Sequence, residues 1–323
     1  MGTPSSSFEL IYETSQANGA FSITDLCRLQ GVSRSGYYRW LNSRTARAER
    51  EARDRADFEL ILSAFRAHNR LKGARSIQME LLHQDPPVAM NLKKINRLMR
   101  KYNLSCPVRK ANPYRRMARA MRTNQVADNL VKREFEAYGP RKILLTDITY
   151  IPYDGQFAYL STILDAYTKQ ILAWQVSSSL EVDFVLMTVE ELIKKHGDEL
   201  YSDTVIHSDQ GSHYTSIKFI ELLRNKNLRQ SMSRKGNCWD NACQESFFGH
   251  MKDEIRDSLK KCQTFEQIKA LLDEQIHYYN QNRYQWKLAK LSPDEFYQYY
   301  KTGVYPIKGV KIPPTRLNQK SKS

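Results

Sequence analysis

A carboxylate in the middle of an apolar, β-prone run constrains this chain more than any other feature. Asp147 lies in the run KILLTDITYI, where an unpaired carboxylate is strongly unfavourable. Asp209 ends a second such run, VIHSD, just before a Gln-Gly pair, and Glu245 lies in the helical pattern CWDNACQESFFGHMK. Three carboxylates on two strand ends and one helix are what a site for two divalent cations about 4 Å apart requires, and such a pair of ions promotes phosphoryl displacement.

The pattern of residues from position 142 onward predicts a mixed α/β sheet. The Asp154-Gly155 break between the first two β-rich runs is short enough for a hairpin. Helix and strand then alternate, which gives strands over 142–153, 156–166, 170–178, 204–208 and 229–233 and helices over 184–195, 216–225, 240–255, 271–282 and from Pro293. If the fourth strand pairs beside the first, Asp147 and Asp209 lie close together.

The overall charge indicates a polyanionic partner. The chain has 323 residues, enough for two or three domains, and a formal net charge of +15. This balance favours nucleic acid, although a ribosomal or membrane-surface protein would also fit it. No run reaches the roughly 18 apolar residues of a membrane span, and the polar start is not typical of a signal peptide. With no Cys-x-x-Cys pair among the five cysteines, we expect a cytoplasmic protein with reduced thiols and no membrane partner.

The segment 23–41 has the pattern of a helix-turn-helix. An apolar helical face ends near Cys27, Gly31 follows in the turn, and Ser33 can cap a second helix. That helix would offer four side chains to a DNA groove: Arg34, Ser35, Tyr37 and Arg39. An ordinary helical hairpin fits the same pattern.

A long stretch of one charge sign follows. Between Asp85 and Asp128 there is no acidic residue, while Lys and Arg occur eleven times. A merely solvated surface would mix signs, so this segment favours phosphate contact. Its helical part predicts DNA contacts at Lys93, Lys94 and Arg97, and its Arg-rich end over 106–125 is predicted to be a linker that orders on DNA.

Taken together, these runs resemble a known family. TDITYI, HSDQGSHYTS and SMSRKGNCWDNACQESFFGHMKDE are similar to the catalytic core of insertion-sequence transposases, specifically the B-frame product of the IS3 family, which shares the retroviral-integrase (DDE) fold. Thirty-five residues separate Asp209 from Glu245, as in that family. The resemblance continues through YNQNR and LSP and back to GVSRSGYYRWL, nearly the whole chain. It departs at Lys72-Gly73, where Tyr-Gly is usual, and at Leu144, where a Trp is common.

The resemblance implies a ribonuclease-H-like core that cleaves the ends of a mobile element and joins the freed 3′-hydroxyl to DNA. Asp147, Asp209 and Glu245 would then hold two Mg²⁺ (or Mn²⁺) ions. Lys252, two helical turns after Glu245, would contact the DNA held there, as would Arg234, Lys235 and Asn237. The implied partners are double-stranded DNA, both terminal inverted repeats and target, further copies of the chain on that DNA, and an A-frame protein or fusion. The implied location is the bacterial nucleoid.

Two other functional classes stay open at this point. A ribonuclease-H-fold nuclease would explain the acids but not the basic helices upstream. A catalytically silent DNA-binding regulator would explain those helices but not a complete acid triad. Four other polar residues are interpreted as structural: Asp165 as a turn-bonding strand end, Asp240 as a helix-start acid, and His207 and His213 as packed imidazoles.

The sequence therefore predicts an α/β protein, with a mixed five-stranded ribonuclease-H-like sheet and flanking helices, preceded by an all-α helix-turn-helix region. The predicted regions are a helix-turn-helix module over 1–45, a second helical DNA-binding module over 46–105, a basic linker over 106–135, a catalytic core over 136–300 and a basic tail over 301–323.

Overall fold

The computed structural model describes residues 4–17, 21–69, 72–106, 138–232, 242–310 and 312. The predicted DNA contacts Arg234, Lys235 and Asn237, together with Asp240, lie outside the described residues. The chain forms two compact units, one of residues 1–64 with 96–104 and one of residues 65–95 with 105–323. The predicted second helical module, 46–105, is therefore shared between the two units.

The first unit is helical. Its elements are α1 (Pro4–Ala17), α2 (Ile23–Leu29), α3 (Arg34–Asn42), most of α4 (Arg44–Arg66) and the later part of α6 (Leu92–Lys101). Ser33 caps α3 by accepting a hydrogen bond from the amide of Gly36 at 3.1 Å, and Gly31 supplies the left-handed turn residue with φ +64°. The predicted helix-turn-helix order is confirmed. Helix α1 was not expected, because its Ser-rich start resembles a loop in sequence.

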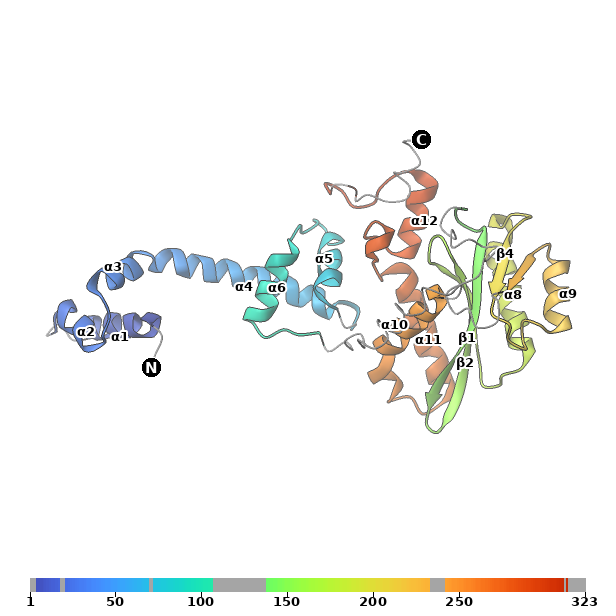
Figure 1. The fold of residues 1–323 in the computed structure, drawn as a ribbon, viewed down its shortest axis with the longest axis horizontal. Coiled ribbons are helices and arrows are strands. Elements are labelled where there is room, and N and C mark those ends of the chain that lie inside the picture. The colour runs from blue at the N-terminus through green and yellow to red at the C-terminus, as the bar shows by residue number, and fades with distance from the viewer. Residues whose placement is uncertain are drawn as a thin grey trace, which may run out of the picture. The chain divides into compact units, whose positions relative to one another are not determined.

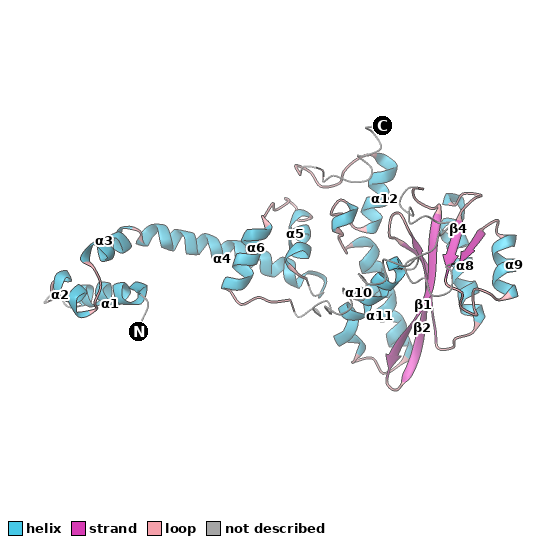
Figure 2. Ribbon diagram, viewed as in Figure 1, coloured by secondary structure: helices cyan, strands magenta, loops and turns pink. Residues whose placement is uncertain are grey.

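The second unit contains the sheet, and Figure 2 shows every strand within it. The strand order is β3-β2-β1-β4-β5. β1 pairs antiparallel with β2 and β2 with β3, while β1–β4 and β4–β5 are parallel. The strands are β1 (Ile143–Tyr153), β2 (Gln156–Asp165), β3 (Ile171–Ser177), β4 (Val205–Ser208) and β5 (Arg229–Met232). The predicted hairpin, the mixed five-stranded sheet and the placement of the fourth strand beside the first are all confirmed.

Helices cover both faces of this sheet (Figure 1). Strand alternation sends Leu144 toward α8 (Val182–His196) and α9 (Ile217–Asn225), and Leu145 toward α10 (Ala242–Leu259) and α11 (Phe265–Gln281). The remaining elements of the unit are α5 (Ala74–Leu82), α12 (Pro293–Thr302) and the short 3₁₀ turns Ala67–Asn69, Gly197–Glu199 and Trp286–Leu288. None of the helices among the described residues is long and apolar enough to cross a membrane.

Asp165 is structural, as predicted. It is fully buried at the end of β2, where one carboxylate oxygen accepts from the amides of Tyr167 (2.8 Å) and Thr168 (3.2 Å). The other oxygen accepts from the guanidinium of buried Arg141 at 2.8 Å. A buried charge is tolerated only when it is paired and hydrogen-bonded, and this carboxylate meets both conditions.

Helix α11 begins six residues before the predicted start at 271. Thr264 caps it in a capping box: its side chain accepts from the amide of Gln267, and the Gln267 side chain accepts from the Thr264 amide at 3.3 Å. The sequence carries this signal as Thr-x-x-Gln before an apolar run, so the true helix start was present in the sequence.

Candidate active site

The parallel pairing of β1 and β4 brings the two segments that carry Asp147 and Asp209 next to each other. The last paired residues on the two strands are Leu145 and His207. Each acid lies two residues beyond its member of that pair: Asp147 is still inside β1, and Asp209 is the first residue after β4. Because side chains alternate between faces with a period of two, Asp147 is on the face of Leu145, which packs against α10 and α11.

Backbone amides orient both carboxylates. The amide of Ile148 donates to Oδ1 of Asp147 at 2.8 Å, and the amide of Gly211 donates to Oδ1 of Asp209 at 2.9 Å. The second contact closes a turn typical of Asp, in which the side chain bonds the amide two residues on. Asp209 is solvent-exposed, whereas Asp147 is half-buried inside its strand.

The side chain of Tyr214 interacts electrostatically with both acids. Its side chain is buried and packs edge-on against Phe219. Burial raises the pKa of Tyr214 well above its usual value, and the negative charges of Asp147 and Asp209 push it in the same direction. Both carboxylates therefore lie within electrostatic range of one side chain, although they are 62 residues apart in sequence.

Helix α10 carries a lysine that interacts electrostatically with Asp147. Its buried face packs on the sheet through Phe247, Phe248 and Met251. Burial lowers the pKa of Lys252, and the carboxylate of Asp147 opposes that shift, so this ammonium lies within electrostatic range of Asp147. Glu245 lies two turns earlier on the same face of α10 and is exposed to solvent.

The donor set suits a hard divalent cation. Carboxylate oxygens from Asp147, Asp209 and Glu245 are the ligands that Mg²⁺ and Mn²⁺ prefer. In the part of the chain that the structure describes, no three His, Cys, Asp or Glu side chains gather closely enough to hold a metal ion. The assignment of all three acids as ligands therefore stays a prediction.

The two histidines near Asp209 form hydrogen bonds within the protein, as predicted. Nδ1 of buried His207 lies 3.0 Å from the hydroxyl of Ser231 on the neighbouring strand. Nε2 of His213 lies 2.9 Å from the carbonyl oxygen of Leu180. Both imidazoles therefore bind the protein scaffold.

One predicted DNA contact on α3 is wrong. Arg34, Ser35 and Arg39 are exposed, but Tyr37 is only 2% exposed. Its ring lies 6.0 Å from that of Trp40, inside the core of the first unit. Tyr37 and Trp40 are three residues apart and therefore share the buried face of the helix, so Tyr37 cannot reach a groove.

The three residues of α6 that were predicted to contact DNA differ in exposure and in their partners. Lys93 is exposed and Lys94 is half-buried. Arg97 instead makes two hydrogen bonds of 2.7 Å to Asp54 on α4, a carboxylate that also accepts from Lys101 at 2.7 Å. A bidentate pair of this kind fixes the guanidinium in place, so Arg97 serves α4–α6 packing.

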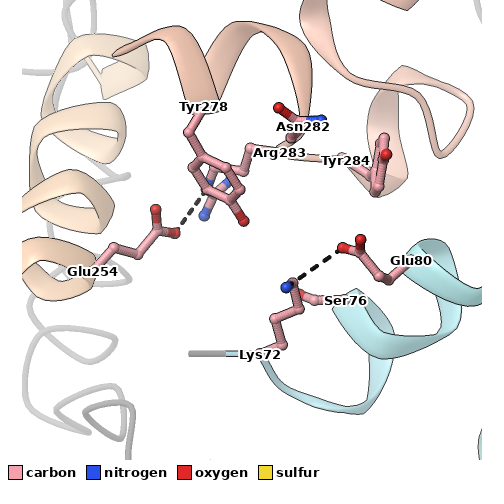
Figure 3. Close-up of a pocket in the computed structure, with 8 residues that line it drawn as sticks. All are labelled: Lys72, Ser76, Glu80, Glu254, Tyr278, Asn282, Arg283 and Tyr284. Atoms are coloured by element: carbon pink, nitrogen blue, oxygen red, sulfur yellow. Dashed lines mark hydrogen bonds and ion pairs between the residues drawn. The ribbon is translucent and has the colours of Figure 1, made fainter. Parts of the chain in front are cut away.

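A small polar pocket lies elsewhere in the second unit, between α5 and the ends of α10 and α11 (Figure 3). Its cations are already paired with carboxylates: Lys72 lies 3.5 Å from Glu80, and Arg283 lies 2.7 Å from Glu254. The pocket lining includes none of the three predicted acids, and Glu254 lies about 13 Å along the helix axis from Glu245.

Sequence reasoning missed two residues that shape the acid site. Gly211 donates its amide to Asp209, and Gln244, fully buried in the first turn of α10, bonds the backbone of β1 and β2. A Gln-Gly pair after an acid is a turn signal that could have indicated Gly211. A glutamine beside a predicted ligand carries no comparable signal.

Comparison with known proteins finds matches to two kinds of family model. Integrase core domain models match residues 137–238, which include Asp147 and Asp209, and residues 245–299, which begin at Glu245. A model described as an HTH-like domain matches residues 51–112, a segment that contains α5 and α6 and does not include the pattern at 23–41.

Three relatives cover most of the chain or most of their own length. An uncharacterized transposase-like protein of Haemophilus influenzae is 35% identical over 208 residues, 64% of this chain and 92% of that protein. Transposase InsF for insertion sequence IS3A of Escherichia coli is 29% identical over 85% of this chain and 94% of its own length. Putative transposase InsK for insertion sequence element IS150, also of E. coli, is 30% identical over 85% and 93%. The chain therefore belongs to the insertion-sequence transposases of the IS3 family, which carry an integrase core domain.

Proposed function

We propose that this protein binds the ends of a mobile element, cleaves them and joins the freed 3′-hydroxyl to DNA, with Asp147, Asp209 and Glu245 as the catalytic carboxylates. The observation that carries the proposal is that β1, which holds Asp147, pairs with β4, which Asp209 follows directly, so that both acids act on the pKa of Tyr214. Helix α10, which bears Glu245, packs on the same sheet. Family membership and the net charge of +15 support DNA as the substrate.

The three carboxylates would hold two Mg²⁺ or Mn²⁺ ions, which when bound supply an activated attacking oxygen and stabilise the leaving oxygen. The protein's part is to fix the acids: Asp147 within a rigid strand and Asp209 in a closed turn, each with one oxygen bonded to a backbone amide. Lys252 would contact a phosphate of the DNA, because its ammonium lies within electrostatic range of Asp147.

The partners of this reaction are the terminal inverted repeats and the target, both double-stranded DNA. Both element ends must be held in one complex for joining, so we propose that several copies assemble on DNA, alone or with an A-frame partner or as a fusion to it. Such an activity places the protein with the nucleoid in the bacterial cytoplasm.

The test uses three isosteric variants of the full chain: Asp147→Asn, Asp209→Asn and Glu245→Gln. An amide of the same shape cannot balance the charge of a cation, so each variant should lose metal-dependent nicking and joining of DNA that carries the native element ends. Binding of end DNA should stay within about threefold of wild type in the absence of metal, because the phosphate contacts remain.

Asp183→Asn is the matched control, since this carboxylate is exposed on α8 and pairs only loosely with Lys218 at 3.2 Å. It should retain full activity. Wild-type joining by any of the three acid variants would refute the assignment. Cleavage of RNA–DNA hybrids without end joining would favour a ribonuclease-H-fold nuclease, and end binding by the wild type without any cleavage would favour a regulator.

A further inference from the structure

Gln244 is a buried amide at the first turn of α10, and its side chain bonds the sheet directly. It is fully buried. Its Nε2 donates to the carbonyl oxygens of Leu145 (2.9 Å) and Thr162 (3.2 Å), and its Oε1 accepts from the Thr162 hydroxyl at 3.4 Å. Both amide protons and the amide oxygen are therefore used, which is an unusually complete anchor for one side chain.

The two anchoring residues flank Asp147. Leu145 lies two residues before it on β1, and Thr162 is its antiparallel partner on β2. Gln244 thus attaches the start of α10 to β1 and β2 at the level of the first acid. Glu245 is the next residue of the helix. By fixing the height and rotation of α10 on the sheet, Gln244 therefore also fixes the direction in which the Glu245 side chain projects.

We propose that Gln244 is a positioning residue: its amide fixes α10 on β1 and β2 so that Glu245 reaches cations held by Asp147 and Asp209. The apolar contacts of Phe247, Phe248 and Met251 hold the helix on the sheet but tolerate small shifts along it. A shift at Gln244 would leave buried polar atoms unpaired, which is strongly unfavourable, so the amide specifies one position. This inference rests on the proposed function.

The first experiment compares Gln244→Leu with Gln275→Leu in the full chain. Gln275 is the matched control because it is a 1% exposed glutamine on α11, and its amide donates to Glu254 at 2.8 Å. Binding of Mn²⁺ without DNA is measured by electron paramagnetic resonance, and the metal dependence of joining is measured in parallel. Gln244→Leu should weaken Mn²⁺ binding about tenfold or more, the usual effect of losing an outer support of a metal site.

End-DNA affinity without metal should be the same in both variants and in wild type, because no phosphate contact changes. A folded Gln244→Leu protein with wild-type Mn²⁺ affinity and wild-type metal dependence of joining would overturn the inference, as would equal losses in Gln275→Leu. If the wild type itself neither binds Mn²⁺ nor joins ends, the proposed function fails, and that result is distinct from a loss confined to Gln244→Leu.

A second pair covers the case in which Gln244→Leu does not fold. Thr162→Val keeps the side-chain volume and removes only the hydroxyl that donates to Gln244 Oε1. Its control is Thr188→Val, another fully buried threonine, whose hydroxyl donates to Ser161 Oγ at 2.9 Å or to the Phe184 carbonyl oxygen at 2.8 Å. Thr162→Val should weaken Mn²⁺ binding in the same direction by a smaller factor, with Thr188→Val unchanged. Unchanged binding in Thr162→Val would overturn the inference.

Discussion

The turn after β4 leaves almost no space beside the Asp209 carboxylate. A Cβ at Gly211 would lie 2.9 Å from Oδ1 of Asp209, closer than real Cβ atoms approach. The same oxygen accepts the Gly211 amide at 2.9 Å, so the carboxylate cannot move away without losing that hydrogen bond. Glycine is therefore needed here because of close approach, and the side chain of Asp209 depends on it.

Gly211→Ala should displace the Asp209 carboxylate and lower the joining rate about a hundredfold, the scale expected when a catalytic group is misplaced by about 1 Å. End-DNA affinity should not change. Gly73→Ala is the control, because a Cβ there meets nothing within 4 Å. The measurement is single-turnover joining at saturating metal. A Gly211→Ala protein with the wild-type rate would show that the turn tolerates the methyl group.

His196 gives the second unit a dependence on pH. Burial lowers its pKa and the positive charge of Arg141 adds to the effect, while the Glu199 carboxylate 3.2 Å away opposes it. The folded state thus takes up a proton at lower pH than the unfolded state, which titrates near 6.5. As pH falls from about 6.5 through the lowered pKa, the unfolded state binds more protons and stability decreases.

We therefore expect the thermal unfolding midpoint to fall between pH 7.5 and pH 5.5, and His196→Gln to reduce that fall. Glutamine keeps a hydrogen-bonding group for Glu199 and cannot take up a proton in this range. The check is calorimetry at both pH values with His277→Gln, a histidine on α11, as the control. An identical pH dependence in wild type and His196→Gln would exclude His196 as the cause.

At the scale of elements, the sequence was sufficient wherever local pattern decides the structure. The β-rich runs, the Asp154-Gly155 turn and the Ser33 cap predicted their elements, and the order of those elements indicated that β4 lies beside β1. That order also predicted that Asp147 and Asp209 meet. The role of Gln244 was out of reach, because it depends on the height of α10 against β1 and β2. The Gln-Gly pair could have indicated a turn at Gly211, but not the close approach of the Asp209 carboxylate that requires glycine there.

In the helical region, too, the sequence does not reveal which charged residues contact each other in the fold. Arg97 belongs to a basic stripe in sequence, and only the fold reveals that Asp54 lies opposite it. Asp54 is 4% exposed, and hydrogen bonds from Arg97 and then Lys101 hold the pKa of its carboxyl well below the usual range. Glu51 extends the network by accepting from Lys101 at 2.5 Å and from the Tyr102 hydroxyl at 2.9 Å. Charges predicted to be available for phosphate are thus used between α4 and α6.

This difference predicts opposite behaviour for two neighbouring cations on α6. Arg97→Ala should lower the thermal unfolding midpoint, because it leaves the buried Asp54 carboxylate without its bidentate partner. Lys93→Ala should leave the midpoint unchanged and weaken DNA binding, with a salt slope about one unit smaller. Differential scanning calorimetry and DNA titrations across a salt series would measure both effects. Equal midpoints for the two variants would mean that the α4–α6 network does not contribute to stability.

At the scale of the whole molecule, we propose that the first compact unit recognises end DNA and the second cleaves and joins it. The first contains α3, with Arg34 and Arg39 exposed, and the second contains the sheet with Asp147 and Asp209. Residues 65–95 pack with the second unit: His83 stacks on Tyr284 with ring centroids 3.6 Å apart and lies 3.1 Å from Glu295 on α12. A cut in the linker would expose these contacts, so variants of the full chain are the better probe.

If the units divide the work in this way, two variants should fail in opposite ways. The double variant Arg34→Ala/Arg39→Ala should lose the preference for end DNA over scrambled DNA, and its salt slope should fall by about two units if both side chains contact phosphates. It should keep metal-dependent nicking of DNA without end sequences, because the acids are untouched. Asp147→Asn should keep the preference and lose all nicking. Arg28→Ala, on the exposed side of α2, is the control and should behave as wild type. Retained end preference in the double variant would place recognition elsewhere in the chain.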